Sequence, residues 1–314
     1  MLTYESPPHN RMREIEKTEP PSMRLRADVV LVLVTVVWGS SFIVVNVVVE
    51  ESPPLTFLFF RFLLAAALAG AFAWRRPRTR GLFRDGLVIG GLLAAGMTMQ
   101  VVGQVETSAS KAAFLTGISV VLTPFAAYAR TRSLPSLENG MGISLAAIGF
   151  FLLTFPAQGG PINRGDLLVF GCAVLFAFYI VEMSLRTPLH DALYLTAIQL
   201  AVVAATAGIF AAAGRAAGLP LESRPVVWEG TFLRAVLYLG TIGTVGTFLS
   251  QTWAQRHMSA THAAIIFALE PVWAALFAAW FLGERLGARG YWGGALVLAG
   301  IVVSELRLSS RGQS

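Results

Sequence analysis

The chain lacks the charge of a water-soluble protein. Only 13% of its 314 residues are charged, whereas 55% are hydrophobic; a soluble domain has roughly 25% charged residues. Too few polar side chains remain to cover a globule in water, so the composition indicates a membrane protein. The net charge of +6 does not indicate a nucleic-acid partner, because Lys and Arg occur in short clusters between long apolar runs.

Cysteine and catalytic signatures are also scarce. The single cysteine, Cys172, lies in an apolar run, which excludes an internal disulfide framework and a thiolate metal cluster. Neither an HExxH metal motif nor a GxSxG nucleophile motif occurs. We therefore predict that the chain is not an enzyme and holds no metal or cofactor. Residues 1–27 are polar and contain no apolar signal region, so we expect a disordered cytoplasmic tail there.

Long apolar runs dominate the rest of the chain. A transmembrane helix needs about 20 apolar residues to cross the hydrocarbon layer. We predict an all-α membrane protein with ten spans, at about residues 28–49, 55–74, 82–104, 108–129, 138–155, 165–185, 191–213, 231–255, 259–282 and 288–305.

The distribution of basic residues predicts the orientation. With the N-terminus inside, sixteen Arg and Lys residues fall in inside segments and seven in outside segments, while Arg61 lies within a span. This bias places both termini, including the tail at 306–314, in the cytoplasm. The chain has far more Arg than Lys and is rich in Ala and Gly, which suggests a GC-rich bacterial genome. We therefore predict a multi-pass protein of the bacterial inner membrane.

The second half of the chain repeats the first. Asp28, Trp38 and Arg61 have the same mutual spacing as Asp166, Phe176 and Gln199. A longer match recurs at a spacing of 151 residues. The first copy contains Gln100, Gln104, Ser108-Ala109-Ser110-Lys111-Ala112-Ala113, Gly142 and Gly149. The second copy contains, in the same order, Gln251, Gln255, Ser259-Ala260-Thr261-His262-Ala263-Ala264, Gly293 and Gly300.

Five spans per repeat is an odd number. The second copy must then cross the membrane in the opposite sense, giving two inverted five-helix repeats. This plan recurs in secondary transporters, because two equivalent halves can exchange conformations and open alternately to each side. The repeat therefore predicts a transporter, whereas a duplicated scaffold or receptor is the alternative.

Several short motifs, in this order, resemble the drug/metabolite transporter superfamily, in particular its EamA-type exporters. They are Trp38-Gly39-Ser40-Ser41-Phe42, Arg61-Phe62, the two Ser-Ala-x-x-Ala-Ala runs, Leu269-Glu270-Pro271 and Gly283-Glu284-Arg285. The first half has no counterpart of Gly283-Glu284. The resemblance implies EamA-like repeats at 28–155 and 165–305, a cavity lined mainly by spans 1, 3, 4, 6, 8 and 9, and export or exchange of amino acids, metabolites or toxic compounds.

Polar residues inside the spans are the candidate substrate site, because ionisable groups in a bilayer are costly and are usually functional. Glu270 lies near mid-depth in the ninth span, where it can bind a proton, pair with a cationic substrate group, or bond freed backbone amides. Pro124 and Pro271 interrupt spans 4 and 9, a feature of binding sites in repeated transporters. The predicted substrate-binding residues are Trp38, Gln100, Gln104, Lys111, Gln251, Gln255, Glu270 and Trp273.

Coupling or gating is predicted for Glu270, Lys111, His262 and Arg61. Lys111 and His262 occupy equivalent repeat positions near opposite membrane faces. They fit a matched pair of gates, charge partners of an anionic substrate, or groups satisfied at the ends of their helices. Arg61 fits a structural pin better than a substrate contact.

These features predict a secondary transporter that exports or exchanges small metabolites, amino acids or drugs by alternating access, with proton coupling as one version. Its predicted partners are a small-molecule substrate and the lipid bilayer, and the sequence is compatible with a homodimer. A lipid flippase or a channel-like permease is the alternative, and a membrane-embedded enzyme fits least well.

Overall fold

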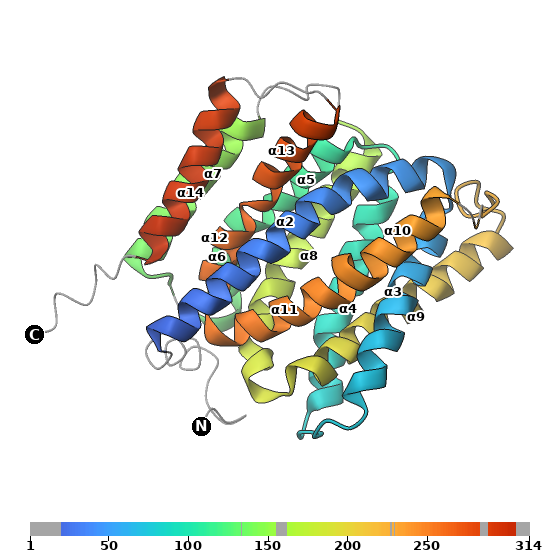
Figure 1. The fold of residues 1–314 in the computed structure, drawn as a ribbon, viewed down its shortest axis with the longest axis horizontal. Coiled ribbons are helices and arrows are strands. Elements are labelled where there is room, and N and C mark those ends of the chain that lie inside the picture. Colours follow the sequence, from blue (N-terminus) through green and yellow to red (C-terminus); the bar gives the residue numbers. More distant parts are fainter. Residues whose placement is uncertain are drawn as a thin grey trace, which may run out of the picture.

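The computed structural model describes residues 20–132, 134–154, 162–226, 228, 230–282 and 288–305. All regular secondary structure in this part of the chain is helical (Figure 1). The first half contains α2 (Pro21–Glu51), α3 (Pro54–Ala73), α4 (Leu82–Gly103), α5 (Ala109–Gly117), α6 (Ser119–Thr131) and α7 (Leu137–Thr154). The second half contains α8 (Arg164–Arg186), η1 (Thr187–Leu189), α9 (Ala192–Ala216), α10 (Thr231–Gly240), η2 (Thr241–Gly246), α11 (Thr247–Ala254), η3 (Gln255–His257), α12 (Ala260–Phe267), α13 (Glu270–Leu282) and α14 (Ala288–Glu305).

The helices agree with an all-α membrane protein. Each of the ten predicted ranges contains helix. Among the described residues, eight helical stretches are long and apolar enough to cross a membrane, and Ala288–Ser304 is a shorter apolar helix. The multi-pass character is thereby confirmed, whereas the number of ten crossings stays a prediction.

The first helix begins earlier than the sequence pattern suggested. α2 starts at Pro21, after Pro20 in an extended conformation. Proline is favoured in the first turn because its missing N–H would have no helical partner there. The prediction of a disordered tail over residues 1–27 is therefore wrong for residues 21–27, and residues 1–19 lie outside the described part of the chain.

The repeated Ser-Ala-x-x-Ala-Ala run marks the start of a helix in both halves. The Ser108 side chain accepts a hydrogen bond from the Lys111 backbone N–H at the start of α5, and Ser259 does the same for His262 at the start of α12. A serine N-cap satisfies a backbone donor that the helix itself cannot satisfy. The motif is thus a helix-start signal that is used twice.

The fourth and ninth predicted spans are each broken into two helices. The first break is at Ile118, between α5 and α6, and the second is at residues 268–269, between α12 and α13. The 151-residue repeat spacing relates Ile118 to Leu269. The second break lies just before Pro271, which cannot continue the hydrogen bonds of the preceding turn. Pro124, however, lies inside α6, so the prediction that it interrupts its span is wrong.

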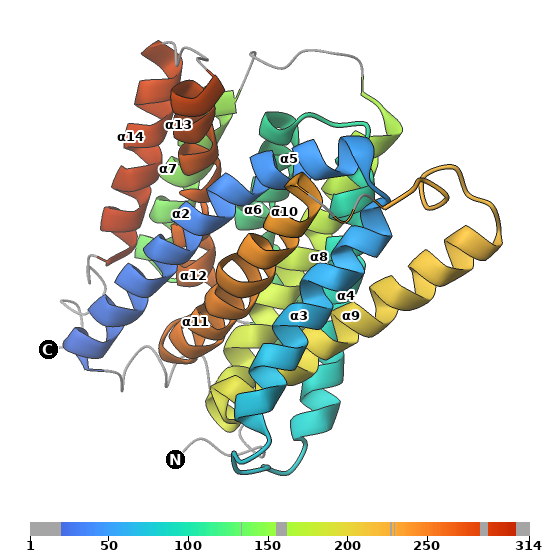
Figure 2. The same cartoon turned by 45° about the vertical axis from the view of Figure 1, so that its right-hand side comes forward.

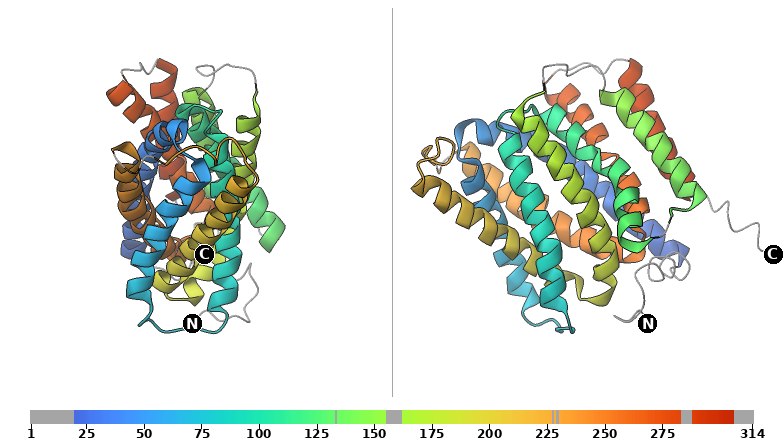
Figure 3. Two further views of the ribbon diagram at one scale, coloured as in Figure 1. Left: turned by 90° about the vertical axis from the view of Figure 1, so that its right-hand side faces the viewer. Right: turned by 180° about the vertical axis from the view of Figure 1, so that it is seen from behind.

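The first helices of the two halves run in opposite directions across the bundle. Figure 2 shows α2 rising from the lower end of the molecule to the upper end, whereas α8 descends from the upper end to the lower. α7 and α14 pack along each other on one flank, and α3 and α9 do so on the other (Figures 1 and 3). Helices of different halves are therefore neighbours throughout the bundle.

Repeat-related glycines meet where α7 packs on α14. A Cβ added at Gly142 would lie 2.7 Å from the Gly300 carbonyl oxygen, and one added at Gly149 would lie 2.5 Å from that of Gly293. Each glycine thus faces the counterpart of the other, as expected for a two-fold relation between the halves. Small residues of this kind let membrane helices approach at backbone distance.

Gly149→Ala is expected to lower the apparent melting temperature of the detergent-purified protein by several degrees. Its Cβ would also lie 2.8 Å from the Val297 backbone N, and overpacking of this kind costs about 1–3 kcal/mol. Gly140→Ala is the matched control on the same helix, because its Cβ would meet no atom within 4 Å. Equal melting temperatures for the two variants would contradict the close approach of α7 and α14.

Candidate functional site

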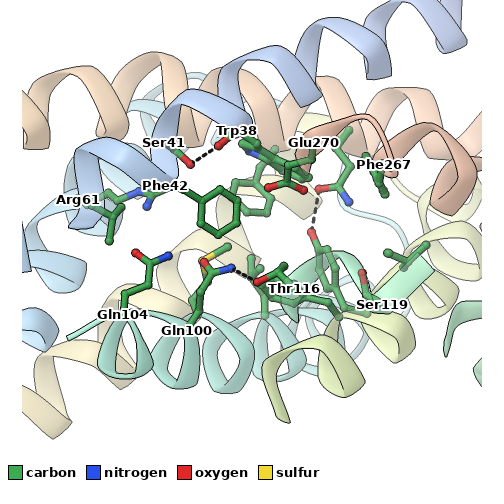
Figure 4. Close-up of a pocket in the computed structure, with 18 residues that line it drawn as sticks. Trp38, Ser41, Phe42, Arg61, Gln100, Gln104, Thr116, Ser119, Phe267 and Glu270 are labelled. Carbon is green, nitrogen blue, oxygen red and sulfur yellow. Dashed lines mark hydrogen bonds between the residues drawn. The ribbon is translucent and has the colours of Figure 1, made fainter. Parts of the chain in front are cut away.

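A cavity lies at the centre of the bundle and joins the two halves (Figure 4). It contains about 640 Å³ of empty space, which includes the open space at its mouth. Its wall is formed by α2, α4, α5, α6, α8, α11, α12 and α13, with Arg61 added from α3. Apart from α3, these helices correspond to spans 1, 3, 4, 6, 8 and 9, as the resemblance implies.

Six aromatic side chains make much of the cavity wall. The Trp38 ring centroid lies 5.5 Å from those of Phe248 and Phe267, and its Nε1 donates to Thr247 Oγ1 at 2.9 Å. This bond holds the indole against the second half of the chain. Such a wall offers apolar and π surfaces to a substrate. The complete aromatic set is Trp38, Phe42, Phe176, Tyr179, Phe248 and Phe267.

Glu270 brings a carboxylate to this wall. It is the first residue of α13, directly after the break in the ninth predicted span, and Figure 4 shows its side chain at the cavity. Within the described residues, its carboxylate forms neither a hydrogen bond nor an ion pair. A carboxylate at bilayer depth costs about 2.5–3.5 kcal/mol on insertion scales. Among the described backbone amides none donates a hydrogen bond to this carboxylate, as the structural alternative would require.

Arg61 brings a guanidinium to a different part of the same cavity. Its Nε donates to Thr244 Oγ1 at 2.8 Å and its Nη2 to the Gly243 carbonyl at 3.4 Å. Both acceptors belong to η2, a π-helical segment, and such segments often occur at functional sites. In Figure 4, Phe42 lies between Arg61 and Glu270. Arg61 is thus both a pin between α3 and η2 and a cavity residue.

Three of the four predicted glutamines reach the cavity. Gln100, Gln104 and Gln251 line it, and Gln100 Nε2 donates to Thr116 Oγ1 at 3.1 Å. The buried Gln104 Oε1 has no hydrogen-bond partner in the described part of the chain. Gln255 does not line the cavity. Its amide donates to the Ile180 carbonyl and Ser184 Oγ and accepts from Gln251, so it joins helices instead.

Trp273 also lies outside the cavity, contrary to prediction. It packs in a smaller apolar cluster with α6, α7 and α14 residues. Gly39 lies against it, because a Cβ there would be 2.7 Å from Trp273 Cβ and 3.0 Å from the Glu270 carbonyl. The Trp-Gly-Ser-Ser-Phe motif thus serves two faces of α2: its glycine admits α13, and Trp38, Ser41 and Phe42 face the cavity.

Lys111 and His262 do not line the cavity. Lys111 Nζ pairs with Asp166 and His262 Nε2 with Asp28. The prediction that Lys111 binds substrate directly therefore has no support in this geometry, whereas the gating interpretation of both residues fits it. The Gly283-Glu284-Arg285 motif lies outside the described residues.

The sequence interpretation missed most of the apolar lining. Phe248 and Phe267 belong to no motif, and Phe42 was recognised only as the last residue of the Trp38-Gly39-Ser40-Ser41-Phe42 motif, without a role in the site. Phe176 was marked, because the repeat register relates it to Trp38, and both line the cavity. Thr116 and Ser119 flank the break at Ile118, so the break itself was the available signal.

Comparison with known proteins agrees with this geometry. The profile of the EamA-like transporter family matches residues 25–155 and 163–306. The chain belongs to the EamA-like transporter family. The two matched segments correspond to the two halves that face each other across the cavity, so this family member contains two EamA units.

Curated relatives of this EamA-like protein cover nearly its whole length. Two proteins of Archaeoglobus fulgidus, each described as an uncharacterized transporter, are 29% identical over 287 residues and 25% identical over 292 residues. Each alignment covers 91% of this chain, and they cover 87% and 99% of the two relatives. A solved crystal structure matches 94% of the chain with a TM-score of 0.72 at 17% identity, which establishes the shared fold.

Proposed function

We propose that this protein is a secondary transporter that exports or exchanges small amphipathic metabolites, amino acids or drugs by alternating access, coupled to protons through Glu270. The observation that carries the proposal is a central cavity that both halves of the chain build, with a carboxylate, Glu270, that has no ion-pair or hydrogen-bond partner among the described residues. A buried carboxylate of this kind is suited to bind a proton or a cationic substrate group in turn.

Many alternating-access transporters are built from two inverted repeats that exchange conformations. Three observations support that relation: α2 and α8 run in opposite directions, the glycine contacts between α7 and α14 are exchanged between halves, and both broken spans lie at equivalent repeat positions. Broken helices at equivalent places in the two halves are typical of transporter binding sites. We place both termini in the cytoplasm of a bacterial cell.

The polar groups of the cavity narrow the substrate class. Glu270 and Gln104 Oε1 offer acceptors, whereas Arg61 offers guanidinium N–H donors beyond its two bonds to η2. The six aromatic rings lie among them. A small molecule with an amino group, an anionic group and an apolar body matches the acceptors, the guanidinium donors and the aromatic rings of the cavity. Amino acids are the simplest members of this class.

The test is a transport screen. A strain without the gene is compared with its complemented form for excretion of amino acids and sensitivity to drugs. Hits are then measured in proteoliposomes with the full chain, with and without a pH gradient. Saturable, substrate-specific flux supports the proposal. Lipid scrambling or ion conductance in place of saturable flux would instead identify a flippase or a channel and refute it.

A further inference from the structure

Several ion pairs join the halves of the chain, and two of them are related by the repeat. Lys111 Nζ lies 2.5 Å from Asp166 Oδ2, and His262 Nε2 lies 2.9 Å from Asp28 Oδ1. The repeat register relates Asp28 to Asp166 and Lys111 to His262. The two pairs are therefore the same contact made twice, with the halves exchanged.

The pairs lie at opposite ends of the bundle. Figure 2 shows α5 and the start of α8 at the upper end, and the start of α2 and α12 towards the lower end. These four helices also form the cavity wall, to which they contribute Trp38, Thr116, Phe176 and Phe267. Each pair thus ties together two wall helices, one from each half, beyond one end of the cavity.

We infer that the two ion pairs are the latches of the two cavity entrances, a conclusion that rests on the proposed alternating access. The Lys111–Asp166 pair holds the end where α5 and α8 begin, and the His262–Asp28 pair holds the end where α2 and α12 begin. Access from one face requires the pair at that face to separate. The four residues are positioning residues, because none of them lines the cavity.

The latches differ in chemistry. The Asp166 carboxylate also accepts from Thr107 Oγ1 and from the Asn163 backbone N–H, each at 3.0 Å, so it stays fixed when Lys111 leaves. In the other latch, Ser304 Oγ donates to the Ile301 carbonyl and lies 3.3 Å from His262 Nδ1.

Both ring nitrogens of His262 therefore face acceptors. One is the Asp28 carboxylate, and the other is the Ser304 oxygen, whose own proton is used on Ile301. A doubly protonated imidazole satisfies both acceptors and adds charge attraction to Asp28. Imidazole changes charge between about pH 5 and pH 8, whereas an ammonium does not. Of the two latches, the one with His262 is therefore the proton-sensitive one.

Several other charged groups belong to elements packed against α12 or its partner Asp28. They include Arg24 and Arg26 on α2, Arg256 and His257 on η3, Glu138 on α7, and the ion-paired Arg130, Glu182 and Arg186 on α6 and α8. A pH response at this end is assigned to His262 only by a variant that changes the imidazole and leaves these groups in place.

Side-specific labelling of a cavity cysteine tests the latches. Cys172→Ser removes the single native cysteine, and Ser41→Cys places a reporter in the cavity wall. The full chain is labelled with a membrane-impermeant thiol reagent in right-side-out and in inverted vesicles. Asp166→Asn is expected to raise labelling from the outer face about fivefold or more. Asp28→Asn is expected to raise labelling from the inner face by a similar factor, because conformational coupling is typically of this size.

Increased labelling from the same face in both variants, or from neither face, would overturn the inference. A variant that raises labelling from both faces, as misfolding would, is resolved by exchanging the charges in Lys111→Asp/Asp166→Lys. Recovery of the parent labelling supports the latch, and no recovery overturns it. If wild-type protein shows no transport but labelling stays side-specific, the proposed function fails and the latches stand. If the wild-type protein transports substrate but its labelling is not side-specific, the proposed function stands and the latch inference fails.

The proton sensitivity is measured in a Glu270→Gln background, which removes the cavity carboxylate. Labelling from the inner face is expected to rise between about pH 5 and about pH 8, the range in which an imidazole changes charge. His262→Lys, the residue of the equivalent position in the first half, should abolish this rise, and Lys111→His should bring a similar rise to the outer face. An unchanged pH response in His262→Lys would show that imidazole is not the sensor.

Discussion

Glu270→Gln is expected to abolish the response of substrate transport to a pH gradient, so that gradient-driven accumulation falls to the level of empty liposomes. The carboxylate has no hydrogen-bond or ion-pair partner in the described part of the chain, so its protonation state depends on water, protons and substrate in the cavity. An amide has the same shape but cannot bind or release a proton. Uptake into proteoliposomes with an imposed pH gradient measures this loss.

Glu222→Gln is the matched control. Glu222 is also a buried carboxylate, but its oxygens accept from the backbone N–H groups of Leu55 and Thr56 at the start of α3, away from the cavity. This variant is expected to keep the pH response and to be less stable than the parent, because a charged cap is lost. A Glu270→Gln variant that still responds to the pH gradient would exclude Glu270 as the coupling group.

The repeat register was the most informative part of the sequence, because it predicted relations as well as elements. It placed Gly142 and Gly149 in one register with Gly293 and Gly300, and the structure brings these glycines together in exchanged pairs. A two-fold relation makes such contacts come in pairs, so one match in the sequence implies two contacts in space.

The same register contained the latches, although only half of each was recognised. Asp28 and Asp166 were seen as equivalent positions, and so were Lys111 and His262, but the acids were not assigned to the bases. The missing step was spatial: in the structure the start of α8 lies beside the start of α5, and the start of α2 lies beside that of α12 (Figure 2).

Helix spacing was a weaker guide to the cavity. Gln251 and Gln255 lie four residues apart, which predicts a shared helix face. The chain tightens into η3 at Gln255, and that side chain turns to Ile180 and Ser184 instead. Spacing alone does not show what lies opposite a helix face. For the same reason Trp273 was assigned to the cavity, although it packs towards the α7 and α14 flank.

Arg61 shows why the choice between structural and functional roles was too narrow. The sequence favoured a structural pin, and the bonds to Thr244 and Gly243 fit that role. The π-helical η2 that supplies these acceptors lies in a Gly- and Thr-rich run that looks like ordinary helix in the sequence. The same guanidinium lines the cavity, so one residue carries both roles.

Arg61→Gln is expected to weaken the transport of substrates that contain a carboxylate, without unfolding the protein. Gln is the residue at the equivalent position of the second half, Gln199, and its amide can keep a bond to Thr244 Oγ1. A hydrogen bond to a charged group contributes about 1.5–3 kcal/mol, so KM for such substrates should rise about 10- to 150-fold. The matched measurement uses an amine of the same skeleton without the carboxylate, whose KM should change little.

Comparing the two substrates distinguishes recognition of the substrate by Arg61 from structural support of the cavity by Arg61. If Arg61 only pinned α3 to η2, the substitution would impair both substrates equally and lower the melting temperature, because the distortion would reach the whole cavity. If it recognises an anionic group, the two KM values diverge while the melting temperature holds, since replacing a buried charge by a neutral group is often tolerated. Arg61→Lys keeps the charge but loses the planar fork of donors, so its KM for the carboxylate substrate should lie between those of the parent and Arg61→Gln.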